Sequence, residues 1–140
     1  MSTGTFFEDL RIGQSASIGK TISEADILMF TAVSLDTNPI HLDAEAAKKT
    51  VFGERIAHGM LSASLISALL GTELPGPGAV YLSQTLDFKR PIRPGDEVTV
   101  KLTVKAVEPP RAVLATQVLV RGKLAVDGEA VVALPAAKAS

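Results

Sequence analysis

The sequence predicts an α+β fold in which a curled antiparallel sheet wraps around one hydrophobic helix. The apolar period changes once along the 140 residues, from mostly helical before Thr72 to mostly strand-like after Gly78. The segment from Gly59 to Gly71 contains no charged residue, and a helix that is apolar on every side is expected to be buried. A sheet that curls around this helix would bury it.

The first half of the chain carries the signals of further helices. Ser23 and Asp26 match a capping box, and the apolar residues that follow predict a helix over residues 24–34. Asp43 can cap a second, short helix over residues 44–49. The charge-free segment is the third helix, which is expected to stop at the glycine that ends it.

The second half of the chain is predicted to form strands joined by short turns. Threonine and lysine alternate with apolar residues from Val98 to Lys105, the period of a strand with one buried face. Turns or bulges are expected at residues 91–95, 109–110 and 127–128. The outer edge of such a sheet favours pairing with a second copy, so a homodimer is expected. The expected strands cover residues 15–21, 79–88, 97–108, 112–121 and 124–134.

The chain length, the net charge and the absence of Cys exclude several classes of protein. The 140 residues are the usual size of one domain, so a single domain over 1–140 is expected, with a frayed tail at 135–140. With 14 Lys plus Arg against 15 Asp plus Glu, the formal net charge is −1, which argues against a nucleic-acid partner. The absence of Cys excludes disulfides and thiolate zinc sites. Neither a signal peptide nor a membrane span is recognisable, so a cytoplasmic protein without a membrane partner is expected.

The segment from Asp36 to His41 is the first candidate for chemistry. Asn38 precedes Pro39 and is therefore disfavoured in the helical region, so a turn can bring Asp36 and His41 to one side of a loop held by Asn38. A carboxylate and an imidazole that converge can share a water molecule and move its proton. Alternatively, Asp36 only caps a turn, or Asp36, His41 and His58 form a metal site with two His and one carboxylate.

The start of the charge-free helix is the second candidate. Free N–H groups at a helix N-terminus favour negative charge, and Gly59 leaves room for a ligand to approach the backbone. Such N–H groups can form an oxyanion hole for a thioester carbonyl that becomes an enolate. The alternative is that Gly59 only makes a tight connection into the helix. His58 is interpreted as a structural histidine bonded near the helix start.

Serines and cations supply further candidates. Ser67 could line a cavity below the oxyanion site, although helical serines also bond back to the preceding turn. A serine nucleophile is not indicated, because no Gly-x-Ser-x-Gly elbow is present. Lys89, Arg90 and Arg93 could contact the phosphates of a nucleotide-bearing ligand, or simply form a solvated turn.

Three segments in order resemble the MaoC-like, (R)-specific enoyl-CoA hydratase family of hot-dog-fold proteins. They begin at Asp36, Phe52 and Phe88 and read DTNPIH, FGERIAHGM and FKRPIRPGD, and the resemblance spans nearly the whole chain, from about Phe7 to Leu134. One departure is Leu35, where many members of the family have glycine before the aspartate.

The resemblance implies a specific mechanism. Asp36 and His41 would be the catalytic pair, Asn38 would support their loop, the Gly59 N–H would bind the thioester oxygen, and Ser67 would line the site. The implied reaction is syn addition of water to a trans-2-enoyl-CoA, which gives an (R)-3-hydroxyacyl-CoA, with no cofactor and no metal. The implied protein is a dimer that binds acyl-CoA near the subunit interface. An acyl-CoA thioesterase on the same fold and a non-catalytic acyl-CoA-binding protein remain as alternatives.

Overall fold

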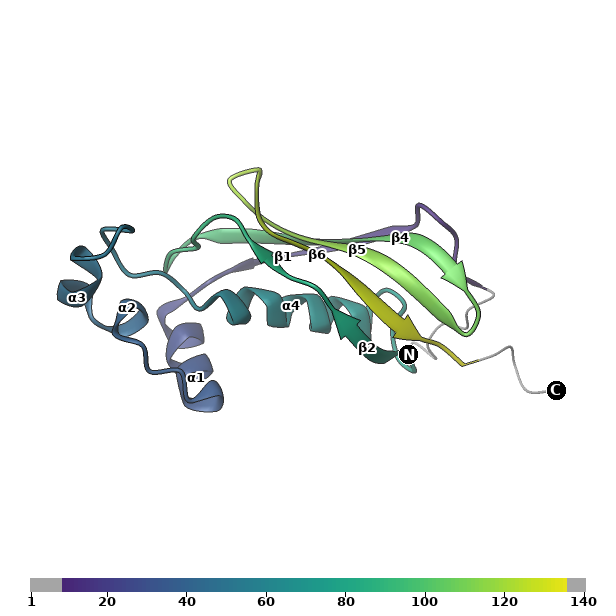
Figure 1. Ribbon diagram of the computed structural model, residues 1–140, viewed down its shortest axis with the longest axis horizontal. Coiled ribbons are helices and arrows are strands. Elements are labelled where there is room, and N and C mark those ends of the chain that lie inside the picture. The colour runs from purple at the N-terminus through teal and green to yellow at the C-terminus, as the bar shows by residue number, and fades with distance from the viewer. Residues whose placement is uncertain (1–8, 136–140) are drawn as a thin grey trace.

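A computed structural model of the chain describes residues 9–135 and consists of one sheet, one long helix packed under it, and three short helices beside them (Figure 1). The N-terminus, where no signal peptide is expected, and all but the first residue of the predicted frayed tail lie outside the described residues. The helices are α1 (Glu24–Ser34), α2 (Pro39–Leu42), α3 (Ala44–Lys48) and α4 (Gly59–Thr72). The strands are β1 (Ser15–Thr21), β2 (Val80–Gln84), β3 (Asp87–Phe88), β4 (Glu97–Glu108), β5 (Arg111–Val120) and β6 (Lys123–Ala133).

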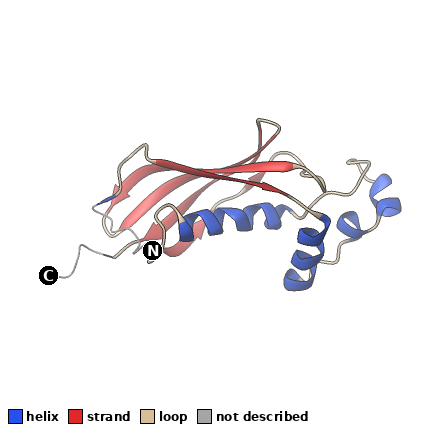
Figure 2. Cartoon of the chain, turned by 180° about the vertical axis from the view of Figure 1, so that it is seen from behind, coloured by secondary structure: helices blue, strands red, loops and turns tan. Residues whose placement is uncertain are grey.

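The sheet is antiparallel, in the order β1-β4-β5-β6-β2, with β3 also paired to β6. Its inner face packs on α4, which contacts β1, β4, β5 and β6 (Figure 2). In β4 the buried residues Val98, Val100 and Leu102 alternate with exposed Thr99 and Lys101, as the sequence predicts. The predicted α+β architecture, a sheet curled around a hydrophobic helix, is therefore confirmed.

Helix α4 is not buried on every side, contrary to the prediction. Leu61, Ile66 and Leu69 face the sheet and are buried, whereas Met60 and Ser67 are exposed on the opposite side. The prediction was wrong because it took the absence of charged residues to mean burial on every side. The exposed side of α4 carries serine, glycine and alanine, which are uncharged but do not have to be buried within one chain. The helix also passes through its predicted stop at glycine and ends one residue later.

The strand predicted over residues 79–88 is divided into β2 and β3, with a register shift between Tyr81 and Ser83. The turn or bulge predicted at residues 127–128 is also wrong, because both residues lie inside β6 in regular register with β5. Gly128 is required there for a different reason: a Cβ atom on Gly128 would lie 1.9 Å from the carbonyl oxygen of Thr85. Glycine therefore permits a close backbone approach rather than a turn.

Candidate active site

The loop between α1 and α2 positions the predicted acid. Helix α1 ends at Leu35, whose backbone is left-handed with φ 65°, and this turn brings the chain back toward α4. The Asn38 side chain caps α2 by accepting a hydrogen bond from the Ile40 N–H at 3.2 Å. The backbone N–H of Asn38 donates to Asp36 Oδ1 at 3.2 Å. Asn38 thus both orients the carboxylate and starts the helix that carries His41.

His41 points one ring nitrogen at this carboxylate. Its Nδ1 lies 2.7 Å from the carbonyl oxygen of Ile56, which can only accept, so Nδ1 carries the proton in the neutral ring. The lone pair is then on Nε2, which lies 3.8 Å from Asp36 Oδ2. This distance is too long for a direct hydrogen bond and suits two groups that hold one water molecule between them. The structure therefore brings Asp36 and His41 together, with the His41 ring buried and Asp36 half exposed.

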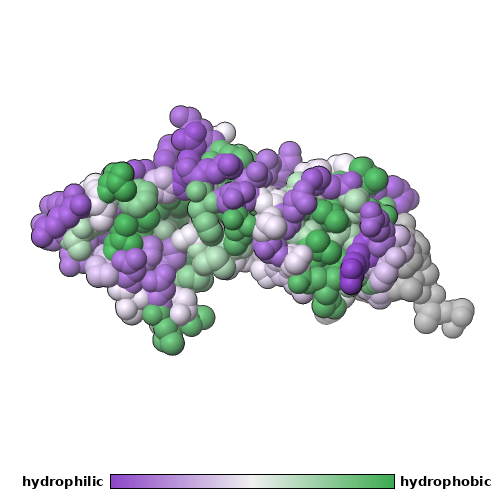
Figure 3. Space-filling view, viewed as in Figure 1, coloured by the Kyte–Doolittle hydropathy of each residue, from purple (hydrophilic) through white to green (hydrophobic). Residues whose placement is uncertain are grey.

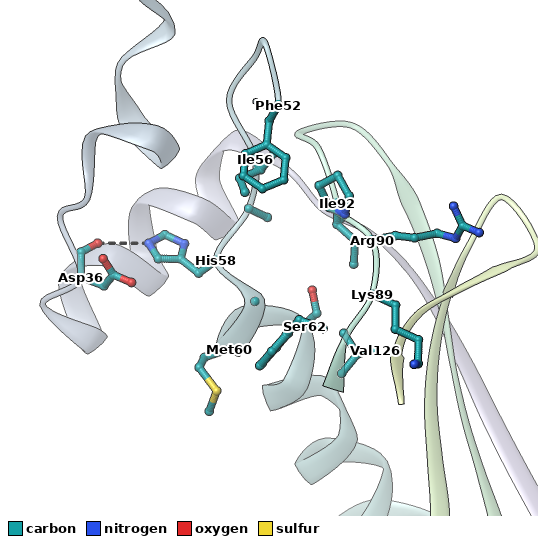
Figure 4. A pocket seen from close by; sticks show the side chains of 14 residues that line it. Asp36, Phe52, Ile56, His58, Met60, Ser62, Lys89, Arg90, Ile92 and Val126 are labelled. Carbon is teal, nitrogen blue, oxygen red and sulfur yellow. Dashed lines mark hydrogen bonds between the residues drawn. The ribbon is translucent and has the colours of Figure 1, made fainter. Parts of the chain in front are cut away.

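His58 anchors the same loop from the other side. The ring is 2 % exposed, and its Nε2 lies 3.1 Å from the backbone oxygen of Asp36 and 3.2 Å from Thr31 Oγ1. Since the Asp36 carbonyl can only accept, Nε2–H is the donor (dashed line in Figure 4). Burial lowers the pKa of His58 below its ordinary value, which keeps the ring neutral against the His41 ring stacked on it at 3.8 Å.

The same three residues define the metal alternative. Asp36, His41 and His58 offer ligand atoms that all lie within 4.8 Å of one another. The two imidazoles, however, are stacked at an interplanar angle of 26°, and each already uses one nitrogen on a backbone carbonyl. Imidazole coordinates a metal in its ring plane, and nearly parallel rings cannot direct both lone pairs at one ion. The geometry favours a hydrogen-bonded acid–base pair over a metal site.

Helix α4 begins beside this pair. No side chain caps its first turn, so the N–H groups of Gly59 and Met60 are not used inside the helix or by its N-cap residue, His58. The ring of Phe88 covers Gly59: a Cβ atom on Gly59 would come within 2.7 Å of it. A side chain at this position would displace the Phe88 ring from the helix start, where the N–H groups and the helix dipole favour an oxyanion.

A cavity of about 410 Å³ extends from Asp36 past the start of α4 (Figure 4). Asp36 and His58 lie at one end of its lining, and Lys89 and Arg90, which form no ion pair with any described residue, lie at the other. Between them the walls are mainly apolar. The other lining residues are Phe52, Ile56, Ala57, Met60, Ser62, Phe88, Pro91, Ile92 and Val126.

Four predicted site residues are not among the residues that line the cavity: Asn38, His41, Arg93 and Ser67. The His41 ring is stacked on the His58 ring, which does line the cavity. Arg93 does not line it, because its Nε forms an ion pair with Glu54 Oε1 at 3.0 Å. Ser67 lies on the exposed face of α4, away from the lining residues. The serine that does line the cavity is Ser62, which the sequence analysis did not select. Its spacing of three residues from Gly59, close to one helical turn, is the signal that could have found it.

Comparison with known proteins agrees with this arrangement. Residues 10–124 match the profile of the MaoC-like domain. The chain belongs to the MaoC-like family. It is 53% identical to an (R)-specific enoyl-CoA hydratase of Rhodospirillum rubrum over 94% of this chain and 92% of that protein. It is 50% identical to a 3-hydroxybutyryl-CoA dehydratase of Methylorubrum extorquens over 93% of this chain and 84% of that protein.

Solved structures of MaoC-like proteins give the same fold. An unliganded R-hydratase of Pseudomonas aeruginosa superposes with a TM-score of 0.89 at 49% identity, covering 95% of this chain and 87% of that one. The hot-dog fold implied by the family resemblance is thus confirmed.

Among the described residues, every helix is too short or too polar to cross a bilayer.

Proposed function

We propose that the protein is an (R)-specific enoyl-CoA hydratase, which adds water reversibly to a trans-2-enoyl-CoA. The observation that carries this proposal is the 3.8 Å separation of Asp36 Oδ2 and His41 Nε2 beside the uncapped start of α4. The relatives named above, at about 50% identity over most of the chain, are hydratases and dehydratases of CoA thioesters. A CoA thioester is therefore the proposed substrate class.

The proposed reaction uses the two ends of this arrangement together. A water molecule held by Asp36 and His41 loses a proton to the pair while its oxygen bonds to C3 of the enoyl group. The electrons of the double bond move to the thioester oxygen, which the Gly59 N–H stabilises. The pair then returns a proton to C2, and the C=O double bond re-forms. Because one pair handles both the hydroxyl and the proton, both are added to the same face of the double bond.

The Nδ1–H of His41 and its acceptor, the Ile56 carbonyl, support this assignment of roles. They fix the ring so that the basic Nε2 faces the water position, and they can stabilise the imidazolium that forms when Nε2 takes the proton. Asp36 is held by the Asn38 N–H on one oxygen and leaves the other facing His41. Asn38 is thus proposed as a positioning residue. At the far end of the cavity, Lys89 and Arg90 are the proposed phosphate contacts.

We also propose that the protein is a homodimer. Strand β2 is at the edge of the sheet, and its residues Val80, Tyr81 and Leu82 are 57%, 40% and 46% exposed. Hydrophobic surface is visible over β2 and at the far end of α1 (Figure 3). An uncharged, exposed edge strand beside the open face of α4 favours burial against a second copy. Ser67 lies on that face, so its expected role in lining the site depends on the second chain.

An assay with crotonyl-CoA tests the function. Loss of the enoyl absorbance without release of free thiol is expected, and the product is expected to be (R)-3-hydroxybutyryl-CoA. Release of thiol would identify a thioesterase instead, and binding without turnover would identify a non-catalytic acyl-CoA-binding protein.

Sedimentation equilibrium tests the dimer, and cell fractionation tests the predicted cytoplasmic location.

A further inference from the structure

Ser62 is a buried polar residue that the proposed chemistry does not use. It lies on α4 three residues beyond Gly59, and it is 1% exposed, yet it lines the cavity. In Figure 4 its hydroxyl points into the space between Ile92 and Lys89. Ser62 therefore presents one hydroxyl group to an otherwise mainly apolar stretch of the wall.

This hydroxyl makes no hydrogen bond with any residue that the structure describes. Helical serines commonly bond back to the preceding turn, and Ser64 does so, since its Oγ donates to the Leu61 carbonyl at 2.5 Å. Thr72 donates to the Ala68 carbonyl in the same way. Ser62 and Ser67 are the two serines of α4 that do not bond back, and of these only Ser62 is buried. A buried polar group without a partner is unfavourable, so its natural partner is a polar group of a ligand in the cavity.

The charges along the cavity indicate which part of the ligand lies beside Ser62. Asp36 and His58 lie at one end of the cavity, beside the helix start where the thioester oxygen is proposed to bind, and Lys89 and Arg90 are at the opposite end. These two cations have no ion-pair partner among the described residues, unlike Arg93 with Glu54. The polyanionic arm of a CoA thioester is expected to run toward them. The thiol arm, rather than the acyl chain, then passes Ser62.

Distance along the helix identifies the group on that arm. Ser62 is displaced from Gly59 by about 4.5 Å along the helix axis. In the CoA arm a short ethylene spacer separates the sulfur from the first amide, so that amide lies at a similar distance beyond the thioester. An amide offers both an N–H donor and a carbonyl acceptor, and a serine hydroxyl can bond to either.

We propose that the Ser62 hydroxyl hydrogen-bonds the amide nearest the sulfur of the CoA arm and so selects the thiol portion of the substrate. This inference rests on the proposed hydratase function and adds to it a residue that binds the substrate away from the reacting carbons. Because the amide does not change during the reaction, the bond contributes equally before and in the transition state. It is expected to lower KM and to leave kcat unchanged.

The test crosses Ser62→Ala with two crotonyl thioesters. One is the N-acetylcysteamine ester, which retains the amide, and the other is a pentanethiol ester of matched length, which lacks it. For the amide ester, Ser62→Ala is expected to raise KM about 5- to 10-fold with kcat unchanged. For the alkyl ester no change is expected, and this result also shows that the variant is folded. The matched control is Ser64→Ala, whose hydroxyl bonds its own helix and whose kinetics are expected to match wild type on both esters.

Other outcomes overturn the inference in distinguishable ways. Equal losses on the two esters would mean that the hydroxyl acts on the thioester or the acyl chain. No loss on either would mean that the hydroxyl binds nothing in the substrate. If the wild-type chain hydrates crotonyl-CoA, either result removes only the role of Ser62. If the wild-type chain hydrates no thioester, the proposed function fails and this inference fails with it.

Discussion

The sheet with α4 and the segment that carries α1–α3 differ in how they use burial. In the first region the buried residues are mainly apolar, with Val100, Leu102 and Leu114 fully buried and only Ser62 and Thr116 as buried polar residues among those that the structure describes. In the second region, which projects to one side of the sheet in Figure 1, the three short helices bury only Ile27, His41 and Ala47. One of those three is an imidazole.

This difference means that the residues that stabilise the fold are mostly not the residues that carry the chemistry. The projecting segment holds its polar groups by local caps and by hydrogen bonds to the backbone around His58, not by a large core of its own. Its acid and base can therefore be changed at little cost to the fold. The sheet mainly contributes stability, and it reaches the site through α4 and through Phe88 and Val126 in the cavity wall. Each prediction below tests that separation.

The largest expected effect is on activity in the projecting segment. Asp36→Asn and His41→Gln each remove one member of the acid–base pair, and each is expected to lower the hydration rate about 10²–10⁴-fold. Steady-state assays with crotonyl-CoA measure this loss. Denaturant unfolding of the same variants should give free energies close to wild type. Near wild-type turnover in both variants would refute the assignment of the pair.

The matching change in the sheet is Leu114→Ala. Leu114 is 0% exposed in β5, and its truncation is expected to lower the free energy of unfolding by about 2–5 kcal/mol. Urea titration at a fixed protein concentration measures this change, because a dimer gains stability with concentration. The kcat of the remaining folded enzyme should stay near wild type. A large fall in kcat per folded molecule would show that the sheet and the site are not separate.

Features that depend on local patterns could be predicted from the sequence, whereas contacts between distant residues could not. The alternation in β4 and the capping box at Ser23 and Asp26 are local patterns, and the structure reproduces both. Helix α2 was missed because the four residues Pro39–Leu42 are too few to show a period. Likewise, no local pattern shows that Gly128 in β6 faces the Thr85 carbonyl, so the glycine suggested a turn or bulge.

Within the site, the sequence predicted which residues come together but not which side of a helix or loop their side chains occupy. The Asp36 and His41 pairing followed from the turn at Pro39. The choice of Ser67 over Ser62 depended on the side of α4 that the cavity occupies, which composition does not reveal when the helix is uncharged throughout. Arg93 pairs with Glu54, which is far away in the chain. The position of Arg93 next to other basic residues in the sequence therefore does not indicate this ion pair.

A smaller effect is expected at Leu35. Its left-handed backbone is strained for a residue with a Cβ atom, and its side chain is 81% exposed. Leu35→Gly should therefore raise the free energy of unfolding by about 0.5–1 kcal/mol, after the entropy that glycine adds to the unfolded chain. Chemical denaturation measures the change. A loss of stability would show that this side chain is buried in the assembled protein.

The smallest expected effect is a pH dependence from His58. Because burial holds its pKa below 6.5 in the folded chain, the unfolded chain binds a proton more readily. The free energy of unfolding should fall as the pH drops below about 6.5 and level off below the folded-state pKa. His41 and Asp36 lie next to this ring and act on its pKa, so the comparison is with His58→Gln, which keeps an N–H donor. An unchanged slope in the variant would exclude His58 as its source.

Hydration of crotonyl-CoA in D₂O tests most directly whether Asp36 and His41 act as one pair on one water molecule. Proton NMR of the product reports the configuration at C2 relative to the new hydroxyl at C3. A single pair on one side of the substrate predicts that deuterium and hydroxyl are added to the same face. Addition to opposite faces would contradict the account, because a second group on the far side of the double bond would then supply the proton.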